Sequence, residues 1–228
     1  MLNGLFVGCM GRKSFKFNSK SEMVPGTIVQ QFSYSQLAEA TEQFSTFKLI
    51  GMGGSSSVYR GQLRNGRTVA VKKLVCRNGP DTDSEFLIEV ELLSRLHHFH
   101  LVLLIGYCIE YNGREVQRLL VYEYMPNGNL RNHLDGTLGR ESLHWITRVR
   151  IALGAARGLE YLHEAATPRV LHRDFKSSNI LLDSKWRAKV KIQHFSFYLF
   201  KYQQQFVFID IRLEYDATNI GFMFYMIC

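Results

Sequence analysis

The stretch His172-Arg173-Asp174-Phe175-Lys176-Ser177-Ser178-Asn179 decides the fold of this chain. Two short apolar segments flank it, Val170-Leu171 on one side and Ile180-Leu181-Leu182 on the other. Short apolar runs on either side of polar residues are typical of strands joined by a turn. We therefore expect this stretch to be a polar turn held between two short strands.

The side chains in this turn suit chemistry on a phosphate group. Asp174 can accept or orient the proton of an attacking hydroxyl, and Lys176 can neutralise charge on a transferred phosphate. Asn179, five residues after Asp174, is a neutral oxygen donor suited to Mg²⁺. Arg173 is a candidate contact for a phosphorylated loop. An inert polar surface turn is the competing interpretation, and the upstream elements weigh against it.

Upstream, the segment Gly51-Met52-Gly53-Gly54-Ser55-Ser56-Ser57-Val58 lets backbone amides approach phosphate oxygens, because glycine lacks a β-carbon. A dinucleotide-binding fold requires a helix directly after the glycines, but here β-branched residues and Asn65-Gly66 predict a strand and a tight hairpin. A Walker loop requires Gly-Lys-Ser/Thr, which is absent. Viewed alone, a glycine-rich hairpin without a ligand remains the alternative.

A lysine and a glutamate add to this pattern. Val69-Ala70-Val71-Lys72 ends an apolar strand in a cation that can reach nucleotide phosphates, whereas Lys73 faces the opposite way because strand side chains alternate. Glu89 lies on the apolar face of the next expected helix and needs a partner there. We expect an ion pair between Glu89 and Lys72.

Hydrophobic periodicity outlines the rest of the chain. Short β-branched segments predict an antiparallel sheet over residues 49–72, 102–107 and 118–124. Helices are expected before Phe44, with Ser33 or Ser35 as its cap, from Asp83 or Ser84, and over Arg148–His163. The fold class is therefore α+β, with a sheet plus one helix in a first lobe and an incomplete helical second lobe.

Composition excludes some classes of protein. The 228 residues are 46% hydrophobic, with 28 Lys and Arg against 20 Asp and Glu, a net charge of +8 that suits anionic ligands without choosing among them. Cys9, Cys76, Cys108 and Cys228 form no metal-binding or paired pattern, so we expect free thiols in a reducing compartment. No apolar run reaches the roughly 20 residues of a membrane helix.

With these motifs in order, roughly residues 32–190 resemble plant receptor-like and receptor-like cytoplasmic Ser/Thr protein kinases, the class related to interleukin-receptor-associated and Pelle kinases. The resemblance also covers Glu91–His98, Leu104–Cys108 and Leu120–Gly128. It implies ATP and Mg²⁺ as cofactors and a Ser/Thr type, from Lys176. The implied catalytic residues are Asp174, Lys176, Lys72 and Glu89. The implied nucleotide-binding residues are Gly51, Gly53, Gly54, Val58, Ala70, Lys72, the gatekeeper Tyr122, the hinge residues Glu123 and Met125, and Asn179, which is also the implied metal ligand.

The chain departs from the family pattern at two places. Ser56 stands where a third glycine is expected, which stiffens the loop slightly. After Ala188-Lys189-Val190 the family has Asp-Phe-Gly or Asp-Leu-Gly, but Ile192 occupies the position of the metal-binding aspartate. We therefore expect a kinase domain truncated before that motif. The expected divisions are a flexible basic leader (1–30), a kinase domain (31–190, with lobes at about 45–125 and 126–190) and an unrelated aromatic-rich tail (191–228).

Two functions are carried forward. The first is ATP-dependent phosphoryl transfer to Ser or Thr hydroxyls of protein substrates. The second is a catalytically inactive fragment that binds ATP weakly or serves as an interaction module for a related receptor kinase. We expect a cytoplasmic protein that binds no nucleic acid, because the basic charge lies on no recognition module. Cys9 beside the basic leader suggests acylation and association with a membrane surface.

Overall fold

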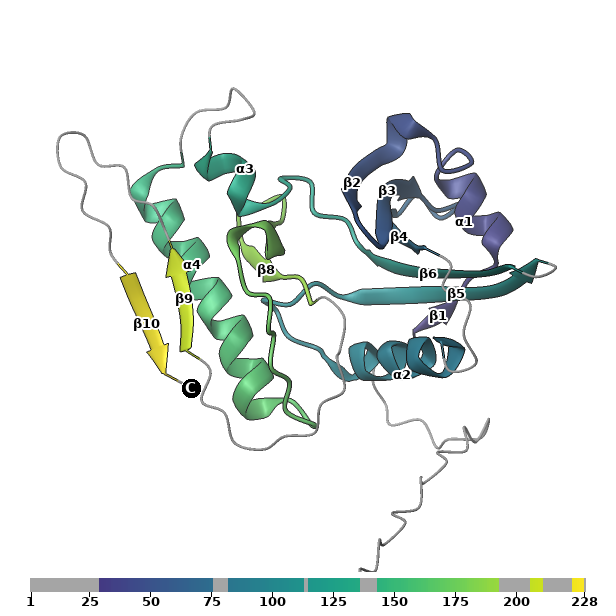
Figure 1. Cartoon of the computed structure of the whole chain (residues 1–228). Coiled ribbons are helices and arrows are strands. Elements are labelled where there is room, and N and C mark those ends of the chain that lie inside the picture. Colours follow the sequence, from purple (N-terminus) through teal and green to yellow (C-terminus); the bar gives the residue numbers. More distant parts are fainter. Residues whose placement is uncertain are drawn as a thin grey trace, which may run out of the picture.

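The computed structural model describes residues 29–75, 82–112, 115–135 and 143–192, and the backbone of two further strands at 206–210 and 223–227. The first lobe is a sheet with two helices, and the second contains mostly helices (Figure 1). The strands are β1 (Gln30–Gln31), β2 (Leu49–Gly53), β3 (Ser56–Gln62), β4 (Thr68–Leu74), β5 (Leu104–Asn112), β6 (Glu115–Glu123), β7 (Ile180–Leu182), β8 (Ala188–Val190), β9 (Phe206–Asp210) and β10 (Met223–Ile227). The α-helices are α1 (Tyr34–Ala40), α2 (Thr82–Arg95), α3 (Leu130–Leu134) and α4 (Trp145–Glu160), and η1 (Thr46–Lys48), η2 (Tyr161–Ala165) and η3 (Ser177–Asn179) are single turns.

The first lobe is built on a six-stranded sheet in the order β1-β5-β6-β4-β3-β2. All neighbours pair antiparallel except the edge strand β1, which runs parallel to β5. Side chains alternate across the sheet, so Val69 and Val71 enter one core with Leu37 of α1, while Leu120 enters another with Phe86 of α2. The sheet is therefore covered by α1 on one face and α2 on the other.

The second lobe packs around α4. Ile151, Ala155 and Leu159 recur at helical spacing on its buried face, and they join a core that also contains residues of β7 and β8. A parallel bridge between Leu101 and Val190 ties β8 to the segment between α2 and β5. This connection positions the β7–β8 hairpin, and the turn before it, next to the sheet of the first lobe.

The expected α+β, two-lobed fold class is confirmed, with several local differences. Ser33, one of the two serines expected to cap α1, does so: its side chain accepts a hydrogen bond from the Gln36 N–H. Val170-Leu171 forms no strand, so that prediction is wrong; Val170 instead donates its N–H to Leu162 at 2.8 Å. In the β3–β4 hairpin only Gly66 has a positive φ, +82°, because Leu63 and Arg67 close a longer loop than the expected two-residue turn.

Some expectations fall on residues that lie outside the described ranges. They include the leader with Cys9, the thiols of Cys76 and Cys228, and residues 193–205 of the aromatic-rich segment. Cys108 is described: it is a buried free thiol, and burial raises its pKa to about 12. No helix within the described ranges has the length and apolar character needed to cross a membrane.

Candidate active site

The turn at residues 172–179 forms a compact polar cluster. The Asp174 carboxylate accepts a bond from Lys176 Nζ at 2.8 Å through Oδ1 and one from Asn179 Nδ2 at 3.0 Å through Oδ2. Asn179 also donates to the Asp174 carbonyl at 2.7 Å and is only 1% exposed. The amide of Asn179 therefore fixes both the backbone and the side chain of Asp174, and the structure brings these three predicted residues together.

The electrostatics keep Asp174 ionised. Burial acts to raise its pKa, but the hydrogen bonds from Lys176 and Asn179 and the charges of Lys176 and His172 outweigh burial, so the net shift of the pKa is downward. Arg173, just before it, has a left-handed backbone with φ of 57°. Non-glycine residues adopt this conformation at a cost, and such strain clusters at functional sites. An ionised Asp174 suits a proton acceptor.

Lys72 lies on β4, on the sheet face covered by α2. Burial lowers the pKa of Lys72, and the negative charge of Glu89 on α2 acts in the opposite direction, so the two groups interact across the lobe. Lys73 points to the other face, where Nζ bonds the Tyr34 hydroxyl at 3.2 Å and lies 4.7 Å from the ring centre of Phe44. The structure thus places Lys72 beside Glu89 and Lys73 away from it.

The glycine-rich segment forms the β2–β3 hairpin next to Lys72. Val58 pairs with Gly51 across one side of β3 and with Lys72 across the other. A β-carbon added to Gly51 or Gly53 would meet ordinary contacts at 3.7 and 3.8 Å, and one added to Gly54 would meet nothing within 4 Å. Packing in the fold does not require glycine at these positions. Their absent side chains instead leave the backbone accessible to a ligand.

The expected adenine-binding residues lie at the end of the same sheet. Ala70 pairs with the buried Tyr122, whose pKa is raised by burial and by the charge of Glu89. Met125 follows β6 and is also buried. The side chain of Glu123, however, accepts a bond from the Leu103 amide at 2.8 Å and from Lys189 Nζ at 2.7 Å. It ties the end of β6 to the segment before β5 and to β8. The Glu123 N–H also donates to the Leu103 carbonyl at 3.1 Å, so neither the side chain nor the N–H of Glu123 is free for a ligand.

Sequence reasoning missed Lys191. The pKa of Lys191 is lowered by burial first and then by the charge of Lys72, whereas Asp174 acts to raise it. Lys191 is therefore coupled electrostatically both to the turn that carries Asp174 and to Lys72 on β4. Its neighbour Ile192 is buried, at 8% exposed. The signal was present in the sequence, because a lysine directly precedes the position of the missing aspartate.

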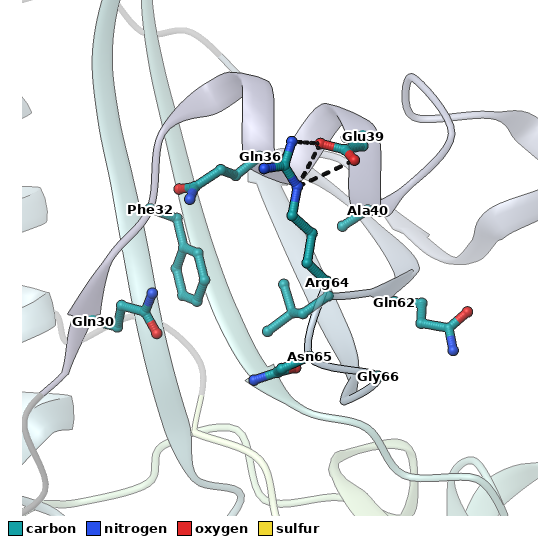
Figure 2. A pocket seen from close by; sticks show the side chains of 10 residues that line it. Gln30, Phe32, Gln36, Glu39, Ala40, Gln62, Arg64, Asn65 and Gly66 are labelled. Carbon is teal, nitrogen blue, oxygen red and sulfur yellow. Dashed lines mark hydrogen bonds and ion pairs between the residues drawn. The ribbon is translucent and has the colours of Figure 1, made fainter.

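A hollow of about 500 Å³ lies in the first lobe between α1, the β3–β4 loop and β1. Figure 2 shows Arg64 reaching across it to Glu39, with an N···O distance of 2.6 Å. None of the predicted site residues lines this hollow. It is therefore separate from the candidate active site.

A glycine-rich hairpin, a strand lysine that interacts electrostatically with a helix glutamate, and an Asp-Lys-Asn turn together define a protein-kinase-like domain. Residues 44–206 match the family described as protein tyrosine and serine/threonine kinase. This match spans most of the chain. The chain belongs to that family of protein kinases.

Individual relatives agree with this assignment. The chain is 58% identical over 184 residues to the receptor-like serine/threonine-protein kinase NCRK of Arabidopsis thaliana, covering 80% of this chain and 32% of that protein. It is 51% identical over 168 residues to the proline-rich receptor-like protein kinase PERK1 of Arabidopsis thaliana, covering 74% and 25%. The chain thus spans about a third or less of these curated relatives.

Among solved structures, the chain resembles the pseudokinase DRIK1, a drought responsive inactive kinase bound to ENMD-2076. The TM-score is 0.65 at 34% identity, and the match covers 73% of this chain and 62% of that one. This likeness extends over both lobes and supports the kinase fold independently of the sequence motifs.

Protein kinases of this family use ATP and Mg²⁺. The site residues of this chain suit the nucleotide better than they suit the metal ion. The open glycine hairpin and Lys72 fit a nucleotide. For Mg²⁺, Asn179 is the only candidate ligand at the expected positions, because the aspartate position holds Ile192. Within the described ranges, no group of three or more His, Cys, Asp or Glu side chains is arranged to hold a metal ion. The site therefore does not fit the two-ligand metal centre.

Proposed function

We propose that this chain binds ATP between its two lobes and that its own transfer of phosphate to protein hydroxyls is very slow. The observation that carries the proposal is the combination of an intact Asp174–Lys176–Asn179 cluster with a buried Ile192 at the metal-binding position. Binding uses the glycine hairpin and Lys72, which are present. Fast transfer uses a metal carboxylate, which an aliphatic side chain cannot replace.

The proposed roles of the site residues follow from their positions. Asp174 accepts the proton of a Ser or Thr hydroxyl, and Lys176 neutralises phosphate charge. Lys72 is held toward the phosphates by Glu89. The adenine lies against Ala70, Tyr122 and Met125 and the backbone of Glu123, under Gly51, Gly53, Gly54 and Val58, while Asn179 is the candidate ligand for a metal.

Phosphoryl transfer itself is the second candidate function, and the ionised Asp174 carboxylate, which can orient or accept the proton of an attacking hydroxyl, is compatible with it. Incorporation of labelled phosphate from ATP into a generic basic protein distinguishes nucleotide binding with slow transfer from active phosphoryl transfer. We expect incorporation by the wild type to be close to the background of Asp174→Asn and Lys72→Met. Robust incorporation that both variants abolish would contradict slow transfer and establish an active kinase. Incorporation that survives both variants would reveal a contaminating enzyme in the preparation.

The proposal extends to domain limits, partners and location. We propose a kinase domain at 31–190 between a leader and a tail, located in the cytoplasm, where it contacts proteins such as a receptor kinase and phosphorylates them slowly or not at all. The similar DRIK1 structure is that of a pseudokinase, an inactive kinase, which supports slow transfer by this chain. Association with a membrane through Cys9 is tested by fractionating cells that express Cys9→Ser. If that variant stays with membranes as the wild type does, Cys9 is not the anchor.

A further inference from the structure

Lys191 is fixed against the Asp174 turn by its main chain. Its N–H donates to the Asn179 carbonyl at 2.8 Å, and its carbonyl accepts a bond from Nε2 of His172 at 2.9 Å. Both partners belong to the turn that carries Asp174. The backbone of Lys191 is therefore held on the catalytic turn at both of its polar groups, and its half-buried side chain starts from this anchored position.

The side chain of Lys191 faces the charged groups of the site. Lys72 on β4, and Asp174 and Lys176 on the turn, all act on it electrostatically. Within the described ranges, no hydrogen bond or ion pair engages its Nζ atom. Its ammonium is thus available to an anion placed between β4 and the catalytic turn.

The charges at this point favour an anion over a cation. Three ammonium groups, Lys72, Lys176 and Lys191, face two carboxylates, Glu89 and Asp174. An aspartate at position 192, with no lysine at 191, would instead give two ammonium groups and three carboxylates. That arrangement favours a divalent cation, whereas the observed one repels it.

We infer that the proposed nucleotide site binds the triphosphate of a nucleoside triphosphate in its metal-free form, with the ammonium of Lys191 neutralising phosphate charge where Mg²⁺ would otherwise do so. This inference rests on the proposed nucleotide site, and it specifies that the bound nucleotide carries no metal ion. Charge-assisted contacts between lysine and phosphate are short and strong. Lys191 supplies its charge without metal ligands, so the neighbouring Ile192 can pack into the apolar core in place of a metal-binding carboxylate.

The test is isothermal titration of the full chain with ATP in EDTA and, separately, in saturating Mg²⁺, with adenosine as a phosphate-free probe. We expect ATP to bind in EDTA at least as tightly as in Mg²⁺. Lys191→Met should weaken the affinity for ATP in EDTA about tenfold and leave the affinity for adenosine unchanged. Lys191→Arg should retain binding. Lys185→Met is the matched control, because Lys185 is exposed in the β7–β8 turn, and it should behave as wild type.

The outcomes separate this inference from the proposed function. ATP binding that requires Mg²⁺, or that is unchanged or tighter in Lys191→Met, overturns the metal-free inference while the nucleotide site stands. Failure of both ATP and adenosine to bind overturns the two together. Circular dichroism melting shows whether Lys191→Met is folded; if it is not, the wild-type comparison of EDTA with Mg²⁺ and the Lys191→Arg affinity decide the question.

Discussion

At the scale of single residues, buried histidines show how much a hydrogen-bond partner matters. His133 and His163 are both 6% exposed. Nε2 of His133 donates to the Asn127 carbonyl at 2.7 Å, whereas neither ring nitrogen of His163 has a hydrogen-bond partner within the described ranges. A buried polar group without a partner keeps its desolvation cost uncompensated.

We therefore predict opposite effects of the same substitution. His163→Leu should raise the free energy of unfolding by about 1 kcal/mol, because it removes an unsatisfied polar group. His133→Leu should lower it by about 1 kcal/mol or more, because the Asn127 carbonyl loses its donor. Urea denaturation of both variants beside the wild type measures the difference. A loss of stability in His163→Leu equal to that in His133→Leu would contradict the assignment.

The residues of the site differ in how far the sequence could predict them. Asp174, Lys176 and Asn179 could be placed together because they lie within six positions of one turn, and Lys72 could be told from Lys73 by strand alternation. The structural use of the Glu123 side chain could not be predicted, because it depends on Lys189, 66 positions away in the sequence. Lys191 was missed because its significance depends on which side chains surround it.

At the scale of elements, the edge strand β1 depends on one close approach. Gly106 pairs with Gln30, and a β-carbon at Gly106 would lie 2.3 Å from the Gln30 carbonyl and 2.4 Å from the ring of Phe32. The two residues of β1 are polar and exposed, so no hydrophobic pattern predicts this strand. By contrast, α2, α4 and β2–β6 follow regular apolar patterns and were predicted with shifts of a few residues at their ends.

The prediction at this scale is that Gly106→Ala displaces β1. The added methyl group meets backbone as well as a packed ring, so we expect a loss of about 2 kcal/mol in stability. Gly53→Ala is the control, because its β-carbon would meet no atom closer than 3.8 Å, and it should leave stability nearly unchanged. Hydrogen exchange at the amides of β1 and β5 locates the effect. Equal melting temperatures for the two variants would argue against the close approach.

At the scale of the whole molecule, stability should depend on pH through two buried histidines, His163 and His172, and the half-buried His98. Burial is the largest cause lowering the pKa of His98, His163 and His172 below the ordinary value of 6.5. The folded state then binds fewer protons than the unfolded state at pH values below about 6.5. The stabilisation is present above that pH and is lost as the pH falls toward the folded pKa values.

We accordingly predict that the melting temperature falls as the pH is lowered from 7 to about 5, before the carboxylates titrate. His163→Leu should flatten this dependence, because one of the three groups is removed. Calorimetry of the wild type and the variant over this range measures both. A melting temperature that is constant or rises on acidification would contradict the burial of these neutral imidazoles.

Nucleotide binding between the two lobes should depend on Lys72. The most direct measurement is the affinity of the full chain for ATP by isothermal titration, compared between Lys72→Met and Lys73→Met, which remove neighbouring ammonium groups on opposite faces of one strand. We predict saturable ATP binding by the wild type and by Lys73→Met. Lys72→Met should bind ATP about tenfold more weakly, or weaker still. Equal affinities for the two variants, or no binding by the wild type, would contradict this prediction.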